Sequence, residues 1–272
     1  MLQIIGSDIT YLILKDFLEL KSSTKLAFLV TNRVSFNQIK QITKLKNKYG
    51  FEFHLDSGAY SFNRLKKDEN CFGHFVRTLR NSYNCFDTVY NYDLYMRPGH
   101  YLKNWHILEN LAGKGFPTVP VLHDYSSLEE ATFYINNGCK EVALGQGDRN
   151  TANINSTTTY LHSYGIKTRL MGCGGFTALS LLTVDSADSA NWRWDAGKYK
   201  NILCKEIGTN GLVNFKTIKV KKLLTMPKNC QIIKDLMSIS PYTLQSLTEE
   251  NYGYRKRCIL NLLMTDVMQG YL

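Results

Sequence analysis

Short apolar runs that alternate with amphipathic stretches are the feature that most constrains the fold of this 272-residue chain. The runs are rich in β-branched residues and are short, as buried strands are. Eight such runs occur: LQIIG near the start, LAFLV (26–30), FEFHLD (51–56), TVYNYD (88–93), TVPVLH (118–123), EVALG (141–145), TRLMG (168–172) and LLTVD (181–185).

The segments between these runs have apolar residues at helical spacing, most clearly over 36–49, 72–82, 101–112 and 128–137. Repetition of strand and helix implies a parallel sheet, and eight strands are the number that a TIM barrel requires. An open doubly wound sheet uses the same alternation, but its three-glycine dinucleotide fingerprint after the first strand is absent. The sequence predicts an α/β fold, a TIM (β/α)8 barrel with a C-terminal helical extension.

The strand–helix pattern becomes less regular after Trp194, which sets the expected domain limits. We expect residues 1–216 to form the barrel and residues 217–272 to form helices packed on it. The stretch 252–268 mixes Arg255, Lys256 and Arg257 with apolar residues. These three side chains either contact the phosphates of a nucleic acid or form the solvated face of a packed helix.

The charge of the chain favours a polyanionic partner. It has 33 Lys and Arg against 23 Asp and Glu, a formal net charge of +10, which suits nucleic acid but also arises from biased codon usage. The seven cysteines are odd in number and never form a C-x-x-C pair, which indicates a reducing compartment. With neither a signal-peptide pattern nor an apolar run of spanning length, the predicted location is the cytoplasm, without a membrane partner.

Polar residues follow almost every predicted strand. In a parallel barrel the active site lies at the carboxyl ends of the strands and in the loops after them. The candidate segments are DSGAYS from Asp56, NYD ending at Asp93, His123-Asp124, GQGD from Gly145, GCGG from Gly172 and DSAD from Asp185. A single Asp at such a position can instead cap a helix. The ordered series of polar segments, rather than any one Asp, therefore indicates an active site.

That ordered series, LDSGAYS, NYD, VPVLH, EVALGQG, RLMGCGG and VDSADSANW over residues 53–192, resembles the tRNA-guanine transglycosylase superfamily. Within it the chain is most similar to the compact phage-type proteins that insert 7-deazaguanines into DNA. The resemblance implies that Asp185 is the nucleophile that attacks C1′ of the nucleoside. It implies that Asp56 is the acid/base carboxylate and that no cofactor takes part.

The same resemblance assigns residues that bind the base. Asp93 would bind the Watson–Crick edge of the purine, and His123 stands near a family glutamine, with a structural histidine as the alternative. The other implied contacts are the small-residue turn Ser57 and Gly58, the backbone of Gly145, Gln146 and Gly147, the pocket-shaping Gly172 and Gly174, and Trp192 for stacking with Arg193 for phosphate. Packing of Trp192 within the barrel is the structural alternative.

The chain departs from the tRNA enzymes in one respect: the C-x-C-x-x-C cluster and following His of their zinc site do not occur in it. We therefore expect no structural metal, and DNA rather than tRNA as the acceptor of the 7-deazaguanine base, with a protein partner for DNA recognition as a possibility. Three alternatives stay open: an enzyme of the same chemistry that acts on tRNA, a metal-dependent barrel hydrolase that uses His54, Asp56, His123 and Asp185, and a noncatalytic nucleic-acid-binding protein.

Base exchange without a net change of configuration requires two inversions and a covalent intermediate. On the implied roles, one carboxylate attacks the sugar while the other carboxyl protonates the leaving guanine and later deprotonates the incoming base. This division of roles requires different environments for the two carboxyl groups, so that the pKa of one is raised while the other stays ionised.

Overall fold

The computed structural model describes residues 2–6, 9–59, 71–94, 96–97, 99–145, 150–173, 175–249 and 252–272. Its centre is a parallel sheet with the strand order β4-β3-β2-β1-β8-β7-β6-β5. The strands are β1 (Leu2–Ile5), β2 (Ala27–Thr31), β3 (Phe53–Asp56), β4 (Thr88–Val89), β5 (Val121–Leu122), β6 (Glu141–Leu144), β7 (Lys167–Leu170) and β8 (Ser186–Ser189). The predicted α/β class with parallel strands is confirmed.

The two strands at the ends of this order, β4 and β5, approach each other beside a parallel bridge between Tyr90 and Val119. The amide of Asn91 donates to the Val119 carbonyl at 2.8 Å, and the Val119 amide donates to the Val89 carbonyl at 2.8 Å. Backbone hydrogen bonds therefore link the two edges of the sheet.

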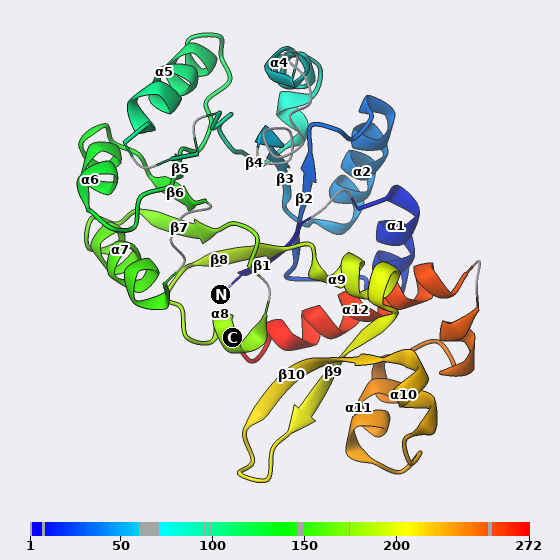
Figure 1. The fold of residues 1–272 in the computed structure, drawn as a ribbon. Coiled ribbons are helices and arrows are strands. Elements are labelled where there is room, and N and C mark those ends of the chain that lie inside the picture. The colour runs from blue at the N-terminus through cyan, green and yellow to red at the C-terminus, as the bar shows by residue number, and fades with distance from the viewer. Residues whose placement is uncertain are drawn as a thin grey trace.

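Helices lie outside the strands in the order of the chain (Figure 1). They are α1 (Tyr11–Leu20), α2 (Phe36–Tyr49), α4 (Cys71–Ser82), α5 (Tyr101–Ala112), α6 (Glu129–Asn136), α7 (Thr151–Ser163) and the short α8 (Phe176–Leu179). Helix α2 shows how the sequence sets such an element: the Ser35 side chain caps its start, and Gly50 ends it with φ +73°. Its buried Ile39, Ile42 and Leu45 keep the spacing of one helix face.

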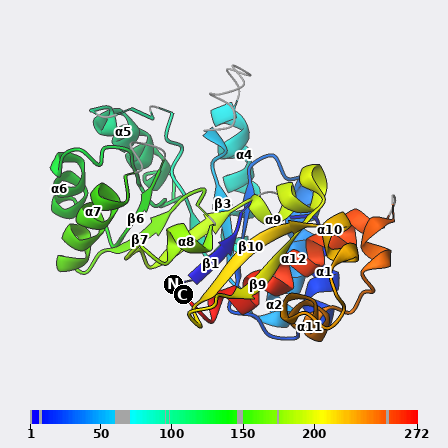
Figure 2. The same cartoon turned by 60° about the horizontal axis from the view of Figure 1, so that its bottom comes forward.

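After β8 the chain leaves the sheet and later returns to it. It forms α9 (Asn191–Trp194), the π-helical turn η2 (Asp195–Tyr199), the antiparallel hairpin β9 (Asn201–Ile207) and β10 (Val213–Lys219), then α10 (Val220–Thr225), α11 (Gln231–Ile239) and α12 (Gly253–Gln269). Helix α12 packs against α1, β1 and β9, and Figures 1 and 2 show it beside the strands with the hairpin outside.

Polar contacts fix α12 to the start of the chain. Arg255 makes two hydrogen bonds to the carboxylate of Asp16 on α1, and Asp266 accepts hydrogen bonds from Lys21 and Thr24. Buried apolar residues of α12 belong to the same core cluster as those of α1 and β2. The last helix is thus an integral part of the helical layer around the sheet.

The structure corrects two sequence predictions. Residues 181–184 are not a strand, because Val184 and Leu182 pack against the cluster around β6 and β7 from a turn, and the strand comprises Ser186–Ser189 instead. The expected domain boundary after residue 216 falls inside β10, so the hairpin and the helices after it are continuous. A search of the described residues for a helix long and apolar enough to cross a bilayer finds none.

Candidate functional site

Three acidic side chains lie toward the carboxyl end of the parallel sheet. Asp56 is the last residue of β3, Asp93 follows β4, and Asp188 lies within β8. Asp93 and Asp188 are buried, and Asp56 is partly exposed. Loss of solvation, together with the negative charges of Asp93 and Asp188, raises the pKa of Asp56 to about 7, although a hydrogen bond from the Gly58 amide opposes the rise. Near neutral pH, Asp56 can therefore both donate and accept a proton.

Asp93 is held by a buried histidine. The His123 Nε2 atom lies 2.9 Å from Asp93 Oδ2, and the Ser57 hydroxyl lies 3.5 Å from Asp93 Oδ1. The backbone amide of His123 donates to the Glu130 carboxylate at 3.1 Å, which fixes the segment after β5. The predicted base-binding residues Ser57, Asp93 and His123 are therefore brought together.

Gly145, at the end of β6, is required by the packing of that histidine. A Cβ atom at this position would lie 2.6 Å from Cε1 of His123 and 2.7 Å from Cγ1 of Val121. The carbonyl of Gly145 accepts a hydrogen bond from the Tyr125 hydroxyl at 2.6 Å. The absence of a side chain lets the backbone of β6 approach the Asp93–His123 pair.

Asp188 lies beside a buried cation. Its Oδ1 is 3.5 Å from Nη2 of Arg169, a fully buried residue of β7 whose guanidinium lies 4.1 Å from the centre of the Tyr90 ring. Desolvation opposes the charge of Arg169, but Tyr90 and Asp188 outweigh it and raise its pKa. A Cβ on Gly6, after β1, would lie only 2.8 Å from Asp188 Oδ2. The carboxylate of Asp188 thus lies next to the buried positive charge of Arg169.

Below the carboxylates, the interior of the sheet contains a polar layer. The His54 Nδ1 atom lies 3.1 Å from Nη1 of Arg169 and 3.2 Å from the Tyr90 hydroxyl. Burial lowers the pKa of His54 despite the hydrogen bond to Glu52 that raises it. A neutral His54 next to Arg169 suits a structural role, because a second buried positive charge there would be repelled.

Asp185 lies at the opposite end of the sheet. It precedes β8, its carboxylate accepts a hydrogen bond from the Thr168 amide at 2.7 Å, and it lies 2.9 Å from His162 Nε2 at the end of α7. Desolvation raises its pKa, but these hydrogen bonds outweigh it and lower the pKa below the usual value. The predicted pairing of Asp56 with Asp185 is wrong, because the strand begins only after Asp185.

The predicted nucleic-acid contacts are also revised. Trp192 is buried and its Nε1 donates to the Gly6 carbonyl at 2.9 Å, so it closes the packing between β8 and β1. Arg257 is buried and donates to the carbonyls of Ala196 and Leu247. The Arg257 guanidinium is used within the fold, so the prediction that it contacts phosphate is wrong, whereas Trp192 also lines the cavity described below and its stacking on a base stays a prediction.

The remaining basic residues of that prediction have partners within the chain. Arg255 pairs with Asp16, Lys256 with Glu249 at 2.8 Å, and Arg193 Nε donates to the Tyr254 hydroxyl at 3.2 Å. Lys256 and Arg193 are only partly buried. Helix α12 is thus mainly a packed helix with a partly solvated basic face.

The other residues of the prediction fall into two groups. Gly58 and Gly172 have φ values of +73° and +71°, which favour glycine at the turns after β3 and β7. Gln146, Gly147 and Gly174 lie outside the described residues. Among the residues that are described, no group of three or more His, Cys, Asp or Glu side chains has the arrangement of a metal site.

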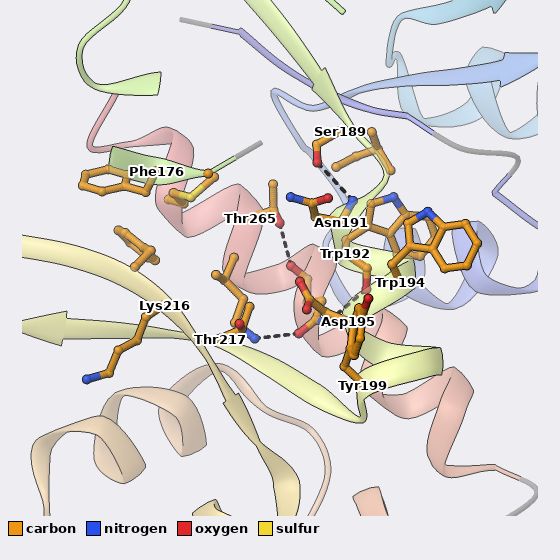
Figure 3. A pocket seen from close by; sticks show the side chains of 16 residues that line it. Phe176, Ser189, Asn191, Trp192, Trp194, Asp195, Tyr199, Lys216, Thr217 and Thr265 are labelled. Carbon is orange, nitrogen blue, oxygen red and sulfur yellow. Dashed lines mark hydrogen bonds between the residues drawn. The ribbon is translucent and has the colours of Figure 1, made fainter. Parts of the chain in front are cut away.

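A cavity of about 380 Å³ adjoins the carboxyl ends of β1 and β8 (Figure 3). Ser189, the residue after Asp188, lines it together with residues of α8, α9, the hairpin and α12. Sequence reasoning missed both this cavity and Asp188. The signal for Asp188 was present, since VDSADS contains two Asp-Ser pairs, but only the strand register distinguishes them.

No protein-family model and no curated protein matches this chain by sequence. Among solved structures, the YdjI aldolase from Escherichia coli K12 is similar with a TM-score of 0.50 and 11% identity, over 99% of this chain and 90% of that one. A native KDPGal structure is similar with a TM-score of 0.43 and 13% identity, over 72% of this chain and 85% of that one. At these identities the similarity concerns the fold alone.

Proposed function

We propose that the chain is a closed (β/α)8 barrel that exchanges guanine in DNA for a 7-deazaguanine base. The hydrogen bonds between the segments after β4 and before β5 support closure. The observation that carries the function is the grouping of Asp56, Asp93 and Asp188 at the carboxyl end of the sheet, with the pKa of Asp56 raised to about 7. This grouping suits the ordered motifs that resemble the guanine transglycosylases.

The role of nucleophile moves from Asp185 to Asp188. Asp188 is buried beside Arg169, whose charge favours the ionised carboxylate. In the proposed reaction an Asp188 oxygen attacks C1′ of the nucleotide, and the bond from C1′ to the guanine nitrogen breaks. An oxocarbenium-like centre next to a carboxylate is stabilised electrostatically.

Asp56 is the proposed acid and base. Its carboxyl protonates the departing guanine, and the resulting carboxylate then removes a proton from the incoming 7-deazaguanine. The nitrogen of that base attacks C1′ and releases Asp188, which restores the original configuration. A pKa of about 7 permits both proton transfers at neutral pH.

The Asp93–His123 pair is the proposed reader of the purine. A carboxylate accepts hydrogen bonds from the N–H groups on the Watson–Crick edge of guanine. The 2.9 Å contact with His123 fixes the orientation of Asp93, and Gly145 leaves the room for that histidine. A target base must leave the stacked duplex to reach these groups, so unpaired or flipped DNA is the proposed substrate.

Incubation of the protein with single-stranded DNA, duplex DNA or tRNA and 7-cyano-7-deazaguanine, followed by nucleoside mass spectrometry, tests this function. We expect a modified deoxynucleoside. The rate of its formation should fall by at least about a thousandfold in Asp188→Asn, since loss of a covalent nucleophile slows a reaction by several orders of magnitude. The matched control Asp185→Asn removes the other Asp of the same motif and should stay within about threefold of the wild type. A modified ribonucleoside would move the function to tRNA.

A further inference from the structure

The cavity beside β8 contains aromatic side chains that the proposed base exchange does not use. Trp194 and Tyr199 lie at its edge with 59% and 50% of their surfaces exposed. Phe176 and Phe215 contribute rings from the other side, with centroids 5.0 Å apart. Large aromatic residues this exposed beside a cavity are typical of a binding site.

Polar groups lie among these rings. Figure 3 shows Asp195, Thr217 and Thr265 along the cavity with Trp194 and Tyr199. Asp195 is half-buried, and one of its carboxylate oxygens accepts from Asn201 at 3.3 Å. The mixture of flat apolar surfaces and a few hydrogen-bonding groups suits a nucleobase, which has two apolar faces and a polar edge.

The charge around the cavity suits a nucleic-acid strand. Lys198, Tyr199 and Lys200 form an exposed run at its edge, and Lys198 Nζ lies 5.3 Å from the centre of the Tyr199 ring. From residue 195 to residue 228 the sequence has eight lysines and two acidic residues, Asp195 and Glu206. Basic groups interleaved with aromatic rings are the arrangement by which proteins bind single strands.

The place of the cavity relative to Asp188 gives it a role. Ser189 lines the cavity and directly follows Asp188 in β8. The cavity adjoins the carboxyl ends of β1 and β8, and Asp188 lies toward the same end of the sheet, so a DNA strand whose target sugar meets Asp188 can extend its neighbouring nucleotides toward the cavity. We propose that this cavity binds an unpaired base of the DNA strand next to the target nucleotide, stacked on Trp194 and Tyr199. The proposal rests on the proposed base exchange at Asp188.

The test measures binding without chemistry. Fluorescence anisotropy gives the Kd for a labelled single-stranded oligonucleotide with one guanine, and for versions with one abasic site at each nearby position, in the absence of 7-deazaguanine. For the wild-type protein, one abasic position should raise Kd by about fivefold or more, as expected for a lost stacking contact. Trp194→Ala should raise Kd for the intact strand by a similar factor. In that variant, the abasic site at the same position should cause no further rise in Kd.

The matched control is Tyr164→Ala. Tyr164 is equally exposed but follows α7, before β7, at the amino end of the sheet, so Kd should not change. Both substitutions are at exposed positions and keep the fold. Equal binding by Trp194→Ala and the wild type, or equal loss at every abasic position, would overturn the proposal.

The same experiment separates this proposal from the base exchange. Coupling between Trp194 and one abasic position, without base exchange on any nucleic acid, supports the binding site and contradicts the proposed reaction. Base exchange on DNA with KM unchanged in Trp194→Ala and in Tyr199→Ala contradicts the binding site and leaves the reaction in place.

Discussion

At the scale of single residues, the two aspartates of the DSADS stretch show how position decides chemistry. Asp185 accepts a backbone hydrogen bond and pairs with His162 at the amino end of the sheet, whereas Asp188 is buried beside Arg169. Asp56, by contrast, ends a strand whose hydrophobic pattern is clear, and sequence reasoning placed it correctly. A three-residue difference therefore separates a structural carboxylate from the candidate nucleophile.

The raised pKa of Asp56 predicts how the stability of the protein depends on pH. Below about pH 4 the carboxyl is neutral in both the folded and the unfolded chain, so wild type and Asp56→Asn should have similar free energies of unfolding. Between about pH 4 and pH 7 this carboxyl ionises in the unfolded chain but not in the folded one, so the wild type loses stability relative to Asp56→Asn, and the loss levels off above about pH 7.

Urea unfolding of both proteins at pH 5, 6, 7 and 8 measures this difference, since the expected pKa of about 7 lies inside the window. The advantage of Asp56→Asn over the wild type should increase from pH 5 to about pH 7 and change little from pH 7 to pH 8. A difference that stays constant from pH 5 to pH 8 would mean that Asp56 titrates as an ordinary carboxyl.

At the scale of elements, apolar periodicity predicted the outer helices better than the last strand. The expected helices 36–49 and 101–112 coincide with α2 and α5, because each buries one face against the sheet. Strand β8 is Ser-Ala-Asp-Ser, and its buried Asp188 meets Arg169 rather than apolar side chains. A strand with a polar interior contact lacks the hydrophobic pattern of a buried strand. The sequence therefore predicted the last strand over the apolar residues 181–185, which form the turn before β8.

Helix α12 connects the hairpin to the segment after β8, in part through the buried side chain of Asn261. Asn261 Nδ2 donates to the Trp192 carbonyl at 3.0 Å, and its Oδ1 accepts from the Leu203 amide at 2.8 Å. Asn261→Ala should lower the free energy of unfolding by about 2–4 kcal/mol, because buried backbone groups lose their partners.

Urea denaturation checks this value, with Asn110→Ala as the control. Asn110 lies in α5, is exposed, and its side-chain oxygen accepts a hydrogen bond from Lys114, so the substitution should change the free energy of unfolding by no more than about 0.5 kcal/mol. Equal effects of the two substitutions would show that the Asn261 contacts do not stabilise the hairpin.

At the scale of the whole molecule, the end of the chain completes the layer of helices around the parallel sheet. Helix α12 packs on α1 and β1, and its buried residues join the main core. The sequence suggested a separate helical extension because the strand–helix pattern is interrupted after β8. Contacts between residues far apart in the chain, such as Arg255 with Asp16 at a separation of 239 and Lys21 with Asp266 at 245, are not visible in local periodicity.

Truncation tests this dependence. A chain that ends at Glu249 lacks α12 and should show no cooperative unfolding transition by circular dichroism, since the removed helix contributes to the main core. A chain that ends at Gly270 keeps the helix and should unfold cooperatively. Cooperative unfolding of the shorter chain would mean that the sheet folds without its last helix.

The most direct test of the account is the identity of the residue that forms a covalent bond with DNA. The protein is mixed with guanine-containing DNA in the absence of an incoming base, quenched, digested and analysed by peptide mass spectrometry. We expect a sugar-linked adduct on Asp188, present in Asp185→Asn and absent in Asp188→Asn. An adduct on Asp185, or base exchange that persists in Asp188→Asn, would contradict this assignment.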